Sequence, residues 1–318
     1  MNAVDLFLYK SDFELRSFRA SYHHSLVIQM EAIPSLKLNL LHCGALTVGP
    51  EWQFNGVVSP FCRLYFIQDG EAYVWHNQQK YTLKPGNLYL IPSYSISRYH
   101  CDNTLSQYYL HFLEETETGL SIFDYAAFEY ELPALPLDEY LFERLLLLNP
   151  ERTLANIDPK AYDNQSDLLS FNAPKPDQWA GAGLETQGIM LQLVSRFIQK
   201  TKSASPVRQQ GFIQFRTVLS YIHTHLSKKI TVEQLAALQH LHVDYFSRQF
   251  QALLGIRPID YIINKRLERA QLLMATTSLS LQSIAEQVGI ADIYYFSRLF
   301  KRRYGLPPGT YRKQSGRV

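Results

Sequence analysis

The sequence predicts an α+β multidomain chain in which an antiparallel β domain is followed by an all-α domain. Strand-sized runs fill the first part, helical spacing dominates the remainder, and a segment near the C-terminus is duplicated. The chain has 318 residues, of which 46% are hydrophobic and 19% are charged, and this length and composition suit about two globular domains. We place the domains at residues 1–205 and 206–318.

Short strand-like runs occupy the region before residue 113. "RLYFIQ" (63–68) and "EAYVWH" (71–76) flank Asp69-Gly70, a two-residue loop that is typical of a hairpin. The turn "KPGN" (84–87) precedes further strands at 88–92, 97–101 and 106–112. Because no helical pattern separates these runs, they predict a barrel or a sandwich.

Helical spacing begins after the predicted strands. We expect helices at 137–148 and 184–199, separated by a loop-rich stretch over 150–180 and followed by a linker at 200–211. The second helix carries an apolar stripe that either packs against the barrel or forms the contact of a homodimer. This stripe comprises Leu184, Ile189, Leu193 and Phe197.

The C-terminal domain begins with a helix over 212–226, whose apolar residues recur every three or four positions. Thr231 and Gln234 form a capping-box pattern that predicts a short helix at 232–239. A tight turn at 240–242 leads to a further helix at 243–254.

An internal repeat dominates this domain. "YFSRQFQALLGIRPIDY" (245–261) and "YFSRLFKRRYGLPPGTY" (295–311) align without a gap at an offset of 50 residues. Each copy predicts a helix-turn-helix unit whose aromatic residues face inward and whose polar residues face outward, as base reading requires. The segment 258–275 between the copies predicts a helix of roughly 25 Å, which could hold the two reading helices about one DNA turn apart.

The charge is divided unequally along the chain. From residue 207 onward there are 16 Lys and Arg against 6 Asp and Glu, which gives +10, whereas the preceding residues carry −8. The basic domain therefore predicts a polyanionic partner. An isolated run such as "FKRR" (300–303) could be a merely solvated face, but duplication of the unit favours DNA binding. Local salt bridges are the alternative role for Arg248 and Arg298.

Other features indicate the cellular setting. Cys43, Cys62 and Cys101 form neither a disulfide framework nor a zinc pattern, which fits a reducing compartment. We see no export signal and no apolar stretch long enough for a membrane helix. We therefore expect a cytoplasmic protein without a membrane partner.

The doubled "YFSR-x-F", the "G-x-x-P" after each copy and "RLERAQLLM" between them resemble the C-terminal domain of AraC/XylS-type transcription regulators over residues 212–313. The resemblance implies a seven-helix domain that binds double-stranded DNA. It implies base-reading roles for Val243, Asp244, Ser247, Arg248, Ile293, Tyr294, Ser297 and Arg298, and phosphate contacts for Lys301, Arg302, Arg303 and Arg312. The chain departs from the family pattern at Ile290, Tyr294 and His242, which bears on the operator sequence.

The segment "YTLKPGNLYLIPSYSISRYH" (81–100) resembles the cupin-like sensor barrel of this family, over about residues 36–113. By this resemblance we expect a small polar effector, such as a sugar, inside the barrel. The implied ligand residues are Tyr99, Gln107 and Tyr109, with Arg63, Trp75 and His111 as further candidates. The alternative is that these side chains simply fill a small barrel.

We expect a one-component transcription regulator without a cofactor, a metal or an enzymatic activity, and with RNA polymerase as a further partner. One alternative is a ligand-independent regulator that acts through protein contacts. Another is a metal-dependent cupin enzyme, for which His76, His100 and His111 are the available histidines. A DNA-repair methyl acceptor would need a reactive cysteine near the DNA, yet all three cysteines lie in the first half.

Overall fold

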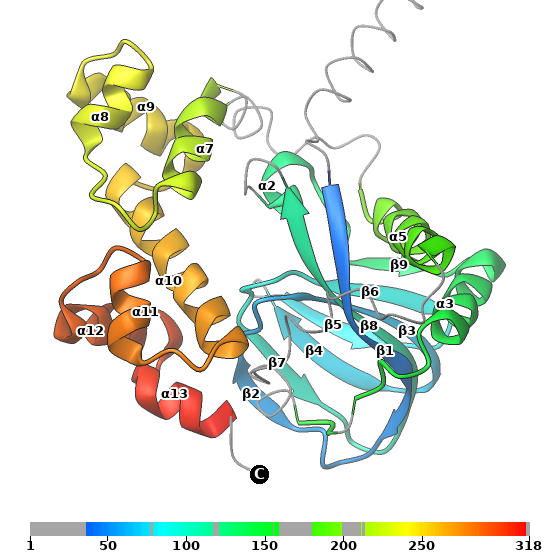
Figure 1. Ribbon diagram of the computed structural model, residues 1–318. Helices are drawn as coiled ribbons and strands as arrows, with labels where there is room; N and C mark the ends of the chain where they lie inside the picture. The colour runs from blue at the N-terminus through cyan, green and yellow to red at the C-terminus, as the bar shows by residue number, and fades with distance from the viewer. Residues whose placement is uncertain are drawn as a thin grey trace, which may run out of the picture.

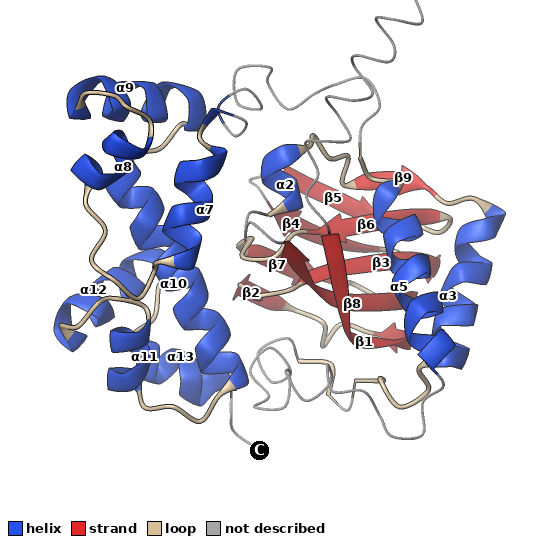
Figure 2. Ribbon diagram, turned by 45° about the horizontal axis from the view of Figure 1, so that its top comes forward, coloured by secondary structure: helices blue, strands red, loops and turns tan. Residues whose placement is uncertain are grey.

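The computed structural model describes residues 36–76, 79–116, 121–154, 156–158, 180–198, 211 and 214–315. Strands with three flanking helices form one part of the molecule, and helices alone form the other (Figure 1). Figure 2 shows the same division, with the helical part lying beside the strands. The predicted α+β architecture is therefore confirmed. Among these residues, every helix is too short or too polar to span a lipid bilayer.

Two antiparallel sheets form the N-terminal barrel. The five-stranded sheet has the order β1 (Leu36–Val48), β8 (Leu105–Thr116), β3 (Cys62–Gly70), β6 (Asn87–Ile91) and β9 (Glu131–Pro133). The four-stranded sheet has the order β2 (Phe54–Val57), β7 (Ser97–His100), β4 (Ala72–His76) and β5 (Gln79–Leu83).

The predicted hairpin across Asp69-Gly70 is wrong. β3 pairs with β6 and β8, whereas β4 pairs with β5 and β7, so the chain crosses from one sheet to the other at this turn. Gly70 has φ 81°, and a Cβ there would lie 2.1 Å from the backbone oxygen of Thr104. The glycine is therefore required for a close crossing between sheets.

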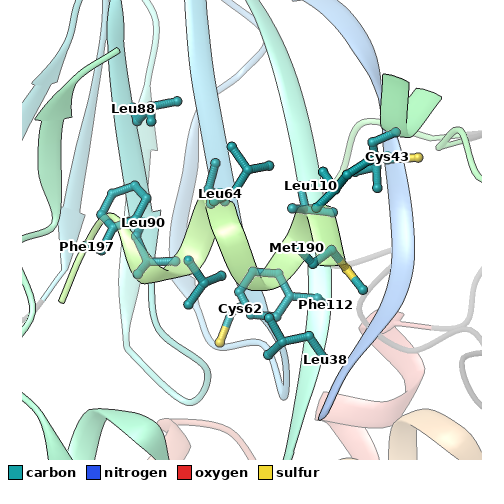
Figure 3. Packing of buried hydrophobic residues seen from close by; sticks show 14 of the residues in the cluster. Leu38, Cys43, Cys62, Leu64, Leu88, Leu90, Leu110, Phe112, Met190 and Phe197 are labelled. Carbon is teal, nitrogen blue, oxygen red and sulfur yellow. The ribbon is translucent and has the colours of Figure 1, made fainter. Parts of the chain in front are cut away.

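Residues of β8 alternate between two cores, as the period of two predicts. Tyr109 faces the barrel interior, whereas Leu110 and Phe112 face the helices outside the five-stranded sheet. Figure 3 shows this outer layer, in which Met190 and Phe197 lie near Leu110, Phe112 and Leu90.

The helices that cover this sheet are α3 (Pro136–Leu148) and α5 (Ala180–Ser195), with the short α2 (Ile122–Tyr125) at the end of β8. The predicted helix at 137–148 is confirmed, and α5 begins four residues before the predicted start. Ile189, Leu193 and Phe197 are buried against the barrel, but Leu184 is 77% exposed and does not belong to their stripe. Packing against the barrel, one of the two expected roles, is thus what the stripe does.

The C-terminal part contains seven helices in the described range: α7 (Arg216–Thr224), α8 (Val232–Leu238), α9 (Val243–Leu254), α10 (Pro258–Thr276), α11 (Leu281–Gln287), α12 (Ile293–Tyr304) and α13 (Pro308–Ser315). The predicted capping box is confirmed, because Gln234 N donates to Thr231 Oγ1 at 3.3 Å and Thr231 N donates to Gln234 Oε1 at 3.0 Å. The predicted linker at 200–211 and most of the loop-rich stretch lie outside the described residues.

The duplicated segments form two equivalent helix-turn-helix units. Phe246 and Phe250 of α9 are fully buried in one core, and Phe296 and Phe300 of α12 are fully buried in the other. Both helices end at a left-handed glycine, Gly255 or Gly305. α10 runs between the units as one 19-residue helix.

Candidate functional site

Of the two predicted reading helices, α12 lies on the side of the helical domain that faces away from the strands, and α9 lies at the end of that domain opposite α13 (Figures 1 and 2). Each is amphipathic, so its buried aromatic side anchors the helix while the polar side remains in solvent. The unit α8–α9 and the unit α11–α12 are joined through α10.

In the first unit, the side chains of Asp244 and Arg248 are exposed, and Ser247 is half-buried beside them. These three can approach the edges of bases. Val243 is half-buried and packs against the apolar cluster of this unit, which gives it a partly structural role. The cap of α9 is weak, because Asp244 N lies 3.4 Å from His242 Nδ1.

In the second unit, Tyr294 is 80% exposed and Arg298 is also exposed. Ser297 is half-buried, and Ile293 packs against the core of its unit, as Val243 does in the first. The cap of α12 is strong, since Asp292 Oδ1 accepts hydrogen bonds from Tyr294 N at 2.8 Å and Tyr295 N at 3.1 Å.

The cationic residues differ between the units. Lys301, Arg302 and Arg303 are exposed in the last turn of α12, whereas α9 has no basic residue in its last turn. Arg312 was assigned a phosphate contact, but the structure places it half-buried on α13, where Nη1 donates to the Leu279 carbonyl at 2.6 Å. This nitrogen holds the loop before α11, whereas Nε and Nη2 have no hydrogen-bond partner among the described residues, so the phosphate contact stays a prediction.

The alternative of local salt bridges finds no support in the described part of the chain. Arg248 Nε donates to the backbone oxygen of Asp244 at 3.4 Å. The Arg298 guanidinium carbon lies 5.8 Å from the centre of the Tyr295 ring. Neither contact neutralises the charge, so both guanidinium groups can meet DNA.

The barrel interior collects most of the predicted ligand residues. Arg63, Tyr99, Gln107, Tyr109 and His111 are all at most 2% exposed, and the alternation of their strands directs them inward. Trp75 does not join them, which corrects the prediction. Ala72, Val74 and His76 are the buried residues of β4, whereas Trp75 lies on the opposite face, 4.6 Å below the guanidinium carbon of Arg98.

Burial and the charges of nearby arginines together determine the protonation of the interior histidines. Burial, together with the positive charges of Arg152 and Arg63, lowers the pKa of His42 to about 4. Burial and Arg63 also hold the pKa of His111 well below its usual range. Both imidazoles are therefore neutral at physiological pH, and they can donate or accept a hydrogen bond.

An AraC-like ligand binding domain matches residues 43–127, and a helix-turn-helix domain matches residues 235–314. This chain belongs to the AraC-type transcription regulators. It is thus a DNA-binding regulator with a ligand-binding domain, as the duplicated helices and the polar barrel interior indicate. The HTH-type transcriptional regulator YisR of Bacillus subtilis is 26% identical over 264 residues, which cover 79% of this chain and 85% of that protein.

Further relatives match the AraC-type chain over shorter stretches. The raffinose operon transcriptional regulatory protein RafR of Pediococcus pentosaceus is 32% identical over 113 residues, covering 36% of this chain and 41% of that protein. Among solved structures, the C-terminal domain of the two-component response regulator yesN from Fusobacterium nucleatum is 36% identical. The match covers 30% of this chain and 94% of the yesN domain, with a TM-score of 0.30.

Two interior residues of this AraC-type regulator, His42 and Trp52, were not predicted. His42 and His111 have ring centroids 5.7 Å apart, and Trp52 lies 4.9 Å from Tyr99. His42 points inward because the pairing of β1 with β8 shifts between Leu40 and His42. No sequence signal marks that bulge, whereas the buried Trp52 could have been suspected from its place before a strand.

The three histidines of the metal-enzyme alternative lie apart in this AraC-type fold. His111 is inside the barrel, His76 stacks on Tyr81 at 4.6 Å, and His100 pairs with Asp102 on the outer face. Within the described ranges, no three His, Cys, Asp or Glu side chains come together as metal ligands. Burial raises the pKa of all three cysteines, to about 12 for Cys43, which keeps these thiols protonated.

Proposed function

We propose that this chain is an effector-controlled, non-enzymatic regulator whose barrel interior binds a small polar molecule of the sugar class. The relative named as a raffinose operon regulator supports this choice of ligand class. In this proposal, binding of the effector in the barrel alters how α9 and α12 bind DNA. RNA polymerase is the further partner, whose contact with the DNA-bound regulator changes transcription. An effector can do this only if it binds two states of the protein with different affinity.

The observation that carries the ligand proposal is the polar surface inside the barrel. Gln107 is 2% exposed, and its Oε1 has no hydrogen-bond partner among the described residues. It lies on the inward face of β8 with Tyr109 and His111. A buried amide oxygen without a partner costs free energy, and a ligand hydroxyl would satisfy it.

Thermal unfolding of the full chain with galactose, raffinose and other small sugars tests this proposal. A binding sugar should raise the melting temperature, and Gln107→Ala should reduce that increase. Gln79→Ala, on the exposed face of β5, is the matched control and should retain it. If every sugar leaves the melting temperature of the wild-type chain unchanged, the sugar class is wrong.

A second candidate is a ligand-independent regulator that works through protein contacts, including those of a homodimer. It is favoured by exposed apolar side chains on one face of α3, where Leu137 is 52%, Tyr140 68% and Leu147 73% exposed. Positions 137, 140 and 147 are separated by three and seven residues, which aligns them along the helix. This face of α3, and not the buried stripe of α5, is the surface that a partner could cover.

A further inference from the structure

The barrel and the helical domain meet at the loop between β2 and β3. Gln271 of α10 is fully buried, and its Nε2 donates to the Val58 carbonyl at 2.5 Å. Tyr311 of α13 donates to the same carbonyl at 3.0 Å, and Gln271 Nε2 also donates to Tyr311 Oη at 2.6 Å. One backbone oxygen of the barrel thus accepts hydrogen bonds from two side chains of the helical domain.

An apolar contact accompanies these hydrogen bonds. Ala275, near the end of α10, is fully buried in a cluster with Leu41 and Phe61 of the barrel. The small side chain of Ala275 permits this close approach. Figure 1 shows the corresponding end of α10 against the barrel. The helix that connects the two DNA-reading units is therefore docked on the sensor domain itself.

Tyr94, in the loop between β6 and β7, also lies at this junction. Tyr94 has a left-handed backbone, with φ 58°, and its amide donates to the Ser59 carbonyl at 2.7 Å. Burial, with the nearby carboxylate of Glu268 on α10, raises the pKa of its phenol. A non-glycine residue in this conformation is uncommon and is retained only where the surroundings hold it.

The other face of the same loop lines the barrel interior. Arg63 Nη2 donates to Ser59 Oγ in a short hydrogen bond. The Phe61 ring stacks on His111, with centroids 5.3 Å apart and an interplanar angle of 30°, and the Arg63 guanidinium carbon lies 5.0 Å from the Phe61 ring centre. Phe61 therefore contacts the proposed effector site and the docked helix at once.

We infer that the segment Val58–Phe61, the coupling segment, transmits occupancy of the barrel to the docking of α10 and α13. The inference rests on the proposed function, because it takes the Arg63–His111 region as the effector site. An effector that binds Arg63 and His111 competes with the contacts that these residues make to Ser59 and Phe61. Since Val58 belongs to the same short segment, a shift of Ser59 and Phe61 moves the carbonyl that Gln271 and Tyr311 share.

The segment can act as a switch because its two faces cannot move independently. The coupling segment is only four residues long and contains no helix or strand. It lies between the barrel interior on one side and α10 on the other. All four are buried, so a change on one side must be accommodated on the other. Undocking would free α10 from the barrel. The second reading unit would then no longer be held in a fixed position relative to the barrel.

Hydrogen exchange of the full chain without any effector tests the coupling directly. Arg63→Met removes the bond to Ser59 from inside the barrel, and Gln271→Ala removes the docking bond. We expect both to accelerate amide exchange roughly 3- to 10-fold in peptides 267–276 and 308–313. Arg98→Met, whose guanidinium lies over Trp75 on the outer barrel face, is the matched control and should exchange as the wild type does.

If Gln271→Ala accelerates exchange in these peptides while Arg63→Met does not, the coupling segment is not the transmitter. If Gln271→Ala has no effect, the interface does not restrain α10 and the inference fails. Ser59→Ala gives the same test by a smaller change should Arg63→Met unfold the barrel, which rapid exchange in β8 would reveal. Because no effector is used, failure here differs from failure of the sugar titration.

Discussion

At the scale of single residues, the arginines show that surroundings decide what a guanidinium does. Arg63 is 2% exposed and donates a hydrogen bond to Ser59 inside the barrel, whereas Arg298 is exposed on a reading helix. Arg312 lies in a basic stretch of sequence, yet its Nη1 is bonded to the Leu279 carbonyl. Charge in the sequence thus predicts a DNA contact only where the helix leaves the side chain in solvent.

Arg298 and Lys301 should differ in what their loss does to DNA binding. Arg298→Ala should lower the preference for the target sequence by roughly 1–3 kcal/mol, as expected for an arginine that reads guanine. Lys301→Ala should weaken target and scrambled duplexes equally and reduce the salt slope by about 0.9. Fluorescence anisotropy at several salt concentrations measures both quantities. Equal loss on both duplexes for Arg298→Ala would remove its base-reading role.

His76 should make the barrel sensitive to acid. Burial lowers its pKa to about 4, below the value of about 6.5 expected in the unfolded chain. The unfolded state therefore binds the proton first, so the stability is complete above pH 6.5 and is lost as the pH falls towards 4. This linkage costs about 2 kcal/mol at pH 5.

His76→Phe should retain the ring stacked on Tyr81 and remove the part of the acid sensitivity that His76 contributes, while the buried His42 and His111 still contribute theirs. Urea unfolding at pH 7 and pH 5 provides the measurement. At pH 7 the histidine is mostly neutral in both states, so its titration contributes little to the difference between variant and wild type. An equal loss of stability between the two pH values in both proteins would contradict this role of His76.

At the scale of helices and strands, the sequence was most informative where local and tertiary preferences agree. In the first unit of the repeat, α9 was predicted at its observed bounds and α8 to within one residue, because each helix has buried apolar residues on one side and a capping residue at its start. The path between the sheets was not predictable, because Asp69-Gly70 suits a hairpin locally and only the pairing of β3 with β8 excludes it. The prediction that Trp75 faces the ligand was wrong for a similar reason, because β4 carries large aromatic residues on its outer face and the sequence does not show which face is inside.

Two glycines at helix ends form a matched pair for testing the helix-turn-helix geometry. Gly289 has φ 78°, and a Cβ there would lie 2.4 Å from the Leu226 carbonyl. Gly305 has φ 79°, but its Cβ would meet no atom within 4 Å. Gly305→Ala should therefore cost about 1–2 kcal/mol for the left-handed backbone alone.

Gly289→Ala should cost clearly more, because the turn must also move away from Leu226. Urea unfolding of the full chain, followed by the helical circular dichroism signal, compares the two variants. The residue after this glycine, Ile290, departs from the family pattern and is only 5% exposed in the core of the second unit. Similar costs for both alanine variants would show that the turn is free to relax.

At the scale of the whole molecule, the two domains present different surfaces. The helical domain offers DNA an exposed cationic turn, whereas the strand domain carries most of the acidic residues and an exposed apolar face on α3. This division keeps the negatively charged sensor away from the phosphates. It also leaves α3 as the surface on which two copies could associate.

Leu147→Glu should weaken that association if α3 forms the contact between copies. Leu147 is 73% exposed, so the substitution should leave the fold intact while placing charge in an apolar interface. Sedimentation velocity over a range of concentrations is the measurement. Leu238→Glu, at a 37% exposed position of α8, is the control and should sediment as the wild type does.

The length of α10 has a consequence for the promoters that this regulator can recognise. Its 19 residues form a rod of about 28 Å that joins the two helix-turn-helix units. If the two reading helices enter successive major grooves, we expect a cognate promoter to carry two short recognition boxes whose centres are about 10 base pairs apart, on one side of the double helix. Five extra base pairs between the boxes would rotate one of them by half a turn, out of reach of the protein.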